Sequence, residues 1–183
     1  LWVPEGGEAP DDTGDMTVLQ APLTKLGCFS TTHATLFHAI GALDKVSLVT
    51  TDKDKWHIEQ VAQQIEDGTT TYVGKNSAPD YELISAAAPQ IILISANTMH
   101  GSDEVLAKLD ELGIPYIADS QHLENHPLGR VEWVKLVGAL LDMEEEADAY
   151  FDEEVQRVNA VAESVAGESE HPTILQTYIF KGT

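Results

Sequence analysis

The chain has 183 residues, 43% of them hydrophobic, and a formal net charge of −21. That length is enough for one sizeable hydrophobic core, or for one domain with part of another, but not for two complete domains. Such an acidic chain repels phosphate backbones and anionic membrane surfaces, so nucleic-acid binding is not expected. The single cysteine, Cys28, excludes an internal disulfide and a zinc site built on several thiolates, and its apolar neighbours predict a buried thiol.

Strands and helices alternate through the first two thirds of the sequence. Residues 1–22, with three prolines and an acidic, glycine-containing patch, are predicted to form a loosely held leader with a short strand at 16–19. Apolar runs then predict strands at 26–29, 46–49, 91–94 and 116–118, and amphipathic stretches predict helices at 32–43, 58–66, 80–87 and 103–112. This order predicts an α/β fold with a mostly parallel sheet flanked by helices, one lobe that spans residues 23–126.

The pattern becomes helical after Pro127. Helices are expected at 128–141 and 143–166, and the second would be about 36 Å long, which suits a strut between two bodies. We therefore predict a helical linker at 127–167. Residues 168–183 contain an apolar strand, 173–180, which must join the existing sheet, pair with another chain to form a dimer, or open a second domain.

Polar residues follow the predicted strands at their carboxyl ends. In a parallel sheet these ends share one edge, where ligands bind because the loops converge there. The sequence therefore predicts a binding mouth, although hydroxyl and amide groups at such positions also cap helices. Its expected lining is Ser30, Thr32, His33, Trp56, Asn76, Asn97, Met99, His100 and Gln121.

Sequence motifs of several enzyme classes are missing. No glycine-rich phosphate loop follows any strand, and no nucleophile elbow or zinc-protease motif is present. One alternative stays open, a metal-dependent α/β enzyme whose loop histidines hold a divalent ion. Those histidines are His33, His57, His100, His122 and His126. They lack ligand-type spacing, so we expect no enzyme, no bound cofactor and no resident metal.

Two stretches resemble a known family. They are "VGKNSAPDYELISAAAPQIILIS" at 73–95, with Gly74, Asn76 and Glu82, and "VLAKLDELGIPYIADS" at 105–120. They are similar to the N-terminal lobe of the substrate-binding proteins of ABC importers for iron-siderophores, haem and cobalamin. The stretch "LGCFSTTHATLFHAIGALDKVSLVT" at 26–50 looks like the first strand, helix and second strand of the same lobe.

The resemblance implies a two-lobed binding protein in which the long helix joins the lobes and residues 168–183 begin a C-terminal lobe that this chain lacks. It implies capture of an iron chelate or a related metal macrocycle, haem and cobalamin included, and delivery to an ABC permease. In the family an acidic residue on the top of each lobe contacts arginines of the permease, and the matching residues here are Glu82 and, beside it, Asp80. An extracytoplasmic location, periplasmic or lipid-anchored, follows from the same resemblance.

Overall fold

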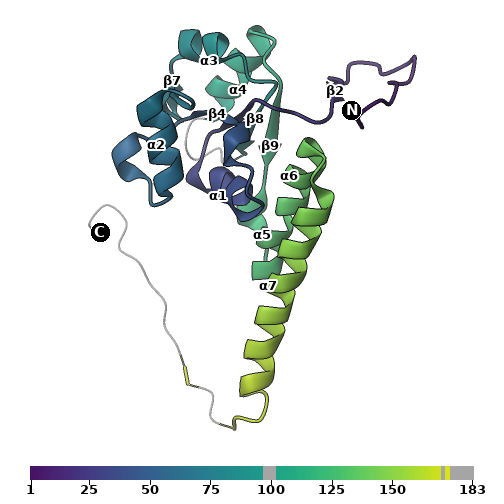
Figure 1. Ribbon diagram of the computed structural model, residues 1–183, viewed down its shortest axis with the longest axis vertical. Helices are drawn as coiled ribbons and strands as arrows, with labels where there is room; N and C mark the ends of the chain where they lie inside the picture. Colours follow the sequence, from purple (N-terminus) through teal and green to yellow (C-terminus); the bar gives the residue numbers. More distant parts are fainter. Residues whose placement is uncertain (97–101, 170–171, 174–183) are drawn as a thin grey trace.

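The computed structural model describes residues 1–96, 102–169 and 172–173 (Figure 1). The strands are β1 (Trp2–Val3), β2 (Leu19–Gln20), β3 (Leu26–Cys28), β4 (Val46–Val49), β5 (Thr71–Tyr72), β6 (Gly74–Lys75), β7 (Ala78–Pro79), β8 (Ile91–Ser95) and β9 (Tyr116–Asp119). The α-helices are α1 (Thr31–Ala39), α2 (Glu59–Asp67), α3 (Tyr81–Ala87), α4 (Ser102–Glu111), α5 (Pro127–Glu132), α6 (Val134–Leu141) and α7 (Glu144–Val165). Short 3₁₀ helices are η1 (Leu43–Lys45), η2 (Lys53–Lys55) and η4 (Gln121–Leu123).

A five-stranded sheet in the order β5-β4-β3-β8-β9 forms the centre of the molecule, and every neighbouring pair in it is parallel. Its strands are short apolar runs because both faces of the sheet are covered. Along β8, Ile91 and Leu93 belong to one hydrophobic core, whereas Ile92 and Ile94 belong to the other. The predicted α/β fold with a mostly parallel sheet is confirmed.

Helices cover the two faces of the sheet in separate layers. The first core contains side chains of α1, α2, α6 and α7, including the fully buried Phe37 and Val134. The second contains side chains of α3 and α4, including Ile84 and Leu109. Cys28 lies in the first core, as expected, and burial raises the pKa of its thiol.

The C-terminal helices differ from the expected pattern. The single helix predicted at 128–141 is two helices, α5 and α6, which meet at Trp133, where no proline or glycine marks the break. Helices α6 and α7 pack closely together at Gly138, because a Cβ at this position would lie 2.6 Å from the Cβ of Ala147. Helix α7 then continues away from the sheet, as Figure 1 shows.

Three smaller features also differ. Strand β2 lies at Leu19–Gln20, slightly later than the predicted 16–19, and pairs with β1 in a small parallel sheet. Val3 and Ala21, within the segment expected to be a leader, are both buried. Edge strand β5 was not predicted, because its two residues are too few to form a visible apolar run. The strand predicted at 173–180, and the dimer through it, lie outside the described residues apart from Thr173.

Candidate functional site: the carboxyl edge of the parallel sheet

The carboxyl ends of all five strands lie along one edge, because each neighbouring pair is parallel. The chain runs outward from β3 through β4 to β5, and then returns to the other side of β3 to form β8 and β9. The strand order therefore reverses between β3 and β8, and such a switch point is where open α/β sheets bind ligands. Three of the predicted site residues follow β8 in the sequence and lie outside the described residues, namely Asn97, Met99 and His100.

Ser30 joins strand β3 to helix α1. Its backbone is extended, with φ −146° and ψ 158°, and its Oγ accepts a hydrogen bond of 3.2 Å from the backbone N–H of His33. Ser30 is therefore the N-cap of α1, and its hydroxyl serves a structural purpose. Thr32, in the first turn of the same helix, is exposed.

His33 and Asp119 form a buried pair across the sheet edge. His33 Nε2 contacts Asp119 Oδ2, and the two residues are only 1% and 3% exposed. His33 follows β3 and Asp119 ends β9, so the pair joins two strands that β8 separates. Gln121 supports the carboxylate, because its backbone N–H donates to Asp119 Oδ1 at 3.3 Å.

The environment of Asp119 keeps its carboxylate charged. Burial by itself raises the pKa of Asp119, but the hydrogen bond and charge interaction with His33, together with hydrogen bonds from Gln121, outweigh it. The net effect holds the pKa of Asp119 below its usual range. When the His33 ring is neutral, its proton lies on Nε2 and its Nδ1 is an acceptor; among the described residues this buried Nδ1 has no partner.

Two further predicted residues lie on the other side of β3. Trp56, just after η2, is half-buried against the first core, and its indole N–H donates to the carbonyl of Thr51 at 3.0 Å. The Trp56 ring is thus fixed at the end of β4 with part of its surface in solvent. Asn76 lies in the exposed turn between β6 and β7, and no described hydrogen bond links it to the other predicted residues.

A groove of about 270 Å³ lies where the sheet edge meets the long helix. Helix α1 contributes Thr31, Thr32 and Thr35, and the segment after β9 contributes Gln121. Arg130 of α5 and Tyr150 of α7 line the groove as well, with apolar side chains of α1 and α5 completing it. The structure thus brings Thr32 and Gln121, both predicted site residues, into one hollow.

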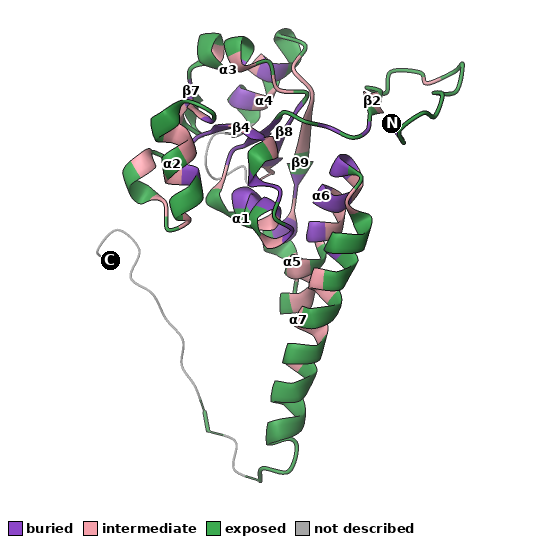
Figure 2. Cartoon of the chain, viewed as in Figure 1, coloured by how far each residue is buried: buried purple, intermediate pink, exposed green. Residues whose placement is uncertain are grey.

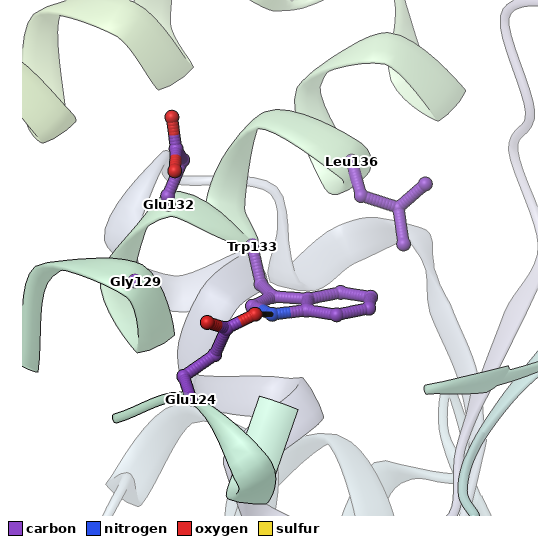
Figure 3. A pocket seen from close by; sticks show the side chains of 5 residues that line it. All are labelled: Glu124, Gly129, Glu132, Trp133 and Leu136. Atoms are coloured by element: carbon purple, nitrogen blue, oxygen red, sulfur yellow. Dashed lines mark hydrogen bonds between the residues drawn. The ribbon is translucent and has the colours of Figure 1, made fainter. Parts of the chain in front are cut away.

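A second hollow, of about 250 Å³, lies beside Trp133 (Figure 3). The Trp133 indole N–H donates to Glu124 Oε1 at 3.2 Å, so the Glu124 carboxylate faces the indole. Gly129 leaves space for that carboxylate, because a Cβ there would lie 2.9 Å from Glu124 Oε2. The carboxylate of Glu124 is therefore occupied by its hydrogen bond with Trp133.

The histidines do not gather into a metal site in the part of the chain that the structure describes. Within those residues, no three His, Cys, Asp or Glu side chains lie close enough together to hold a metal ion. His126 caps α5 by accepting the backbone N–H of Leu128, and His57 and His122 are exposed. His33 is bonded to Asp119, and His100 falls outside the described range.

Glu82 and Asp80 lie at the start of α3. Asp80 is the N-cap, and its carboxylate accepts the backbone N–H groups of Glu82 and Leu83 at 3.0 and 3.1 Å. Glu82 is exposed and forms no described ion pair. The carboxylate of Asp80 is thus engaged in capping α3, whereas the carboxylate of Glu82 forms no capping bond.

Sequence reasoning did not select two residues that the geometry makes prominent, Asp119 and Arg130. Asp119 is the last residue of β9, so the sequence pattern predicts its place at the carboxyl edge. The pattern does not predict that Asp119 is buried against His33. Arg130 is one of two arginines in a chain of net charge −21, which is a compositional signal for a functional cation.

The family model described as "Periplasmic binding protein" matches residues 28–181. This chain belongs to that family. An uncharacterized lipoprotein of Methanocaldococcus jannaschii is 35% identical to it over 152 residues, which cover 79% of this chain and 36% of the relative. The chain therefore spans little more than a third of the length of the curated relative that it matches.

Solved structures share the fold. A periplasmic heme binding protein from Pseudomonas aeruginosa superposes with a TM-score of 0.61 at 21% identity, covering 78% of this chain and 47% of that one. Staphylococcus aureus SirA, solved in complex with staphyloferrin B, gives a TM-score of 0.58 at 18% identity, covering 81% of this chain and 47% of that one. No helix in the described residues is long and apolar enough to cross a membrane.

Proposed function

We propose that this chain forms the N-terminal lobe and interlobe helix of the solute-binding component of an ABC import system. The component captures an iron chelate or a related metal macrocycle and delivers it to a membrane permease. Family membership over residues 28–181 carries the proposal. One structural neighbour is a periplasmic heme binding protein and another was solved in complex with staphyloferrin B, which is consistent with this ligand class.

The carboxyl edge supports a binding role rather than a catalytic one. Its buried polar groups are engaged in holding the edge together: Ser30 caps α1, and Asp119 is bonded by His33 and Gln121. The exposed groups are hydroxyls, an amide and part of an indole ring, which orient and cover a ligand without transferring protons.

Helix α7 supports the presence of a second lobe. Its 22 residues correspond to about 33 Å, and its first turns pack against α5 and α6 through the buried Ala147. Figure 2 shows the far part of the helix exposed along its length. Val161 and Val165 there are 66% and 54% exposed, and a C-terminal lobe would cover such apolar side chains.

Ligand titration of the intact protein tests the proposal. Ferric citrate, ferrioxamine B, haemin and cyanocobalamin would each be titrated while tryptophan fluorescence is recorded. We expect at least one of them to quench Trp56, and Trp56→Ala to weaken that binding by about 1 to 3 kcal/mol, the value of a buried aromatic contact. Trp2→Phe and Trp133→Phe are the matched controls, because neither residue is assigned to the mouth. Absence of binding by all four compounds would contradict the proposal.

We also propose that Glu82 is the permease contact and that Asp80 acts mainly as its helix cap. Glu82→Arg should abolish chelate uptake by cells that depend on the intact protein while leaving chelate affinity unchanged. Glu59→Arg is the control, because Glu59 is likewise exposed in the first turn of a helix, α2. Uptake that survives in Glu82→Arg, or that fails equally in both variants, would show that the contact lies elsewhere.

An extracytoplasmic location follows from the same proposal, since the component must meet its ligand before the membrane is crossed. The relative from Methanocaldococcus jannaschii is described as a lipoprotein, which is consistent with a membrane-anchored form.

A further inference from the structure

Arg130 has no acidic partner among the described residues of a strongly acidic chain. The described ion pairs within 4.0 Å include Arg157 with Glu153 and Glu154, but none that contains Arg130. Its guanidinium is held by main-chain carbonyls instead, Nε donating to Glu124 O at 3.4 Å and Nη2 to His122 O at 3.3 Å. These bonds hold the side chain, and no described carboxylate pairs with it.

The two acidic residues near Arg130 in sequence, Glu124 and Glu132, line the hollow beside Trp133 and not the groove that contains Arg130. Glu124 supplies its backbone carbonyl to Arg130, while its carboxylate accepts a hydrogen bond from the indole N–H of Trp133 (Figure 3). The groove that contains Arg130 has no Asp or Glu in its lining. Arg130 is therefore the charged residue that lines this groove, on a molecule whose formal net charge is −21.

The remaining lining suits an anion that carries oxygen atoms. Thr31 and Thr32 line one wall beside Thr35, whose hydroxyl donates to the Thr31 carbonyl at 3.0 Å, and Gln121, only 6% exposed, lines the same space. The Gln121 Nε2 contact to Asp119 Oδ2 is long, at 3.5 Å, and its Oε1 makes no hydrogen bond within the described residues. A guanidinium, hydroxyls and an amide together are the donors that bind carboxylate or catecholate oxygens.

We propose that this groove, defined by Arg130, Thr35 and Gln121, binds an anionic substituent of the metal chelate and selects anionic chelates over neutral or cationic ones. The inference rests on the proposed function and adds the charge class of the ligand. Because hydrogen bonds to charged groups are worth more than neutral ones, loss of Arg130 should weaken anionic ligands selectively.

The test compares chelates of different charge on the intact protein. Anionic ferric citrate and a ferric tris-catecholate would be compared with cationic ferrioxamine B and with cyanocobalamin by isothermal titration calorimetry. We expect an anionic chelate to bind best, and Arg130→Gln to weaken it about tenfold or more. Arg157→Gln, which removes the other arginine far along α7, should leave its affinity unchanged.

A second pair of variants guards against a folding effect at Arg130. Thr35 is exposed, so Thr35→Glu adds a carboxylate to the groove without disturbing the bonds of Arg130, and it should weaken anionic chelates about as strongly. Thr35→Gln, of similar size and uncharged, should weaken them much less.

Different failures separate the two proposals. A protein that binds ferrioxamine B or cyanocobalamin best, or that binds anionic chelates equally well after Arg130→Gln and Thr35→Glu, overturns the charge selection and leaves the solute-binding function intact. A protein that binds none of these compounds and no haemin overturns both.

Discussion

The edge of the central sheet at the carboxyl ends of the strands and the edge at their amino ends bury different kinds of side chain. The carboxyl edge buries four polar side chains, those of His33, Thr50, Asp119 and Gln121. At the amino edge the strands begin in apolar residues such as Leu26 and Ile91, and Thr70, just before β5, is the buried polar residue on that side. Thr70 is fully engaged, since its hydroxyl donates to the carbonyl of Val46 at 2.7 Å.

The two edges therefore differ in how many polar side chains they bury. A buried polar group lowers stability unless it is hydrogen-bonded, so a cluster of them needs a reason beyond folding. At the amino edge the polar group has its partner within the fold. At the carboxyl edge His33 Nδ1 has none among the described residues, and the ring is bonded through Nε2 to Asp119.

The largest effect should come from breaking the buried pair. Asp119→Ala removes the partner of His33 and leaves a second ring nitrogen unsatisfied, which should lower the free energy of unfolding by about 3 kcal/mol. Thr70→Val at the amino edge removes one neutral hydrogen bond and should cost only about 1 kcal/mol. Urea denaturation of the two variants measures both, and equal losses would show that the edges are energetically alike.

A smaller effect should depend on pH. The folded-state pKa of Asp119 is held below its ordinary value of 3.8, so the unfolded chain binds the proton more readily. Its contribution to stability is therefore complete above pH 3.8 and is lost as the pH falls through the lower folded-state pKa. Asp119→Asn removes this titration while keeping an acceptor for His33. The stability gap between wild type and Asp119→Asn should narrow in acid, and a constant gap would contradict the pairing.

The smallest effect should come from the helix caps. Ser30→Ala and Asp80→Ala each remove an N-cap, of α1 and α3, and should each lower the free energy of unfolding by about 1 kcal/mol. Only Ser30 lies at the carboxyl edge near the switch point, so Ser30→Ala should also weaken chelate binding. Thermal unfolding and titration of both variants separate the two effects. Equal chelate affinity in both variants would limit Ser30 to a capping role.

The sequence by itself determined the fold class and placed several polar residues at the carboxyl edge of the sheet. Continuous apolar runs such as 91–94 predict strands buried on both faces, and the alternation with helices predicts their parallel order. Parallel strands bring their carboxyl ends to one edge, so Ser30, His33 and Gln121 could be assigned to that edge from local signals alone. Element limits were less well determined, since α1 ends at Ala39, before the expected residue 43, and the helix expected at 128–141 is divided at Trp133.

Only the tertiary structure decided which polar residues meet. The pairing of His33 with Asp119 joins residues 86 positions apart, and it depends on β8 lying between β3 and β9. The groove around Arg130 likewise needs α1, α5 and α7 to converge, and the carboxylate of Glu124 lies outside its lining, bonded to Trp133. Local sequence sets backbone preference and burial pattern, whereas the charge around a side chain depends on neighbours that only the packed fold brings within hydrogen-bonding distance.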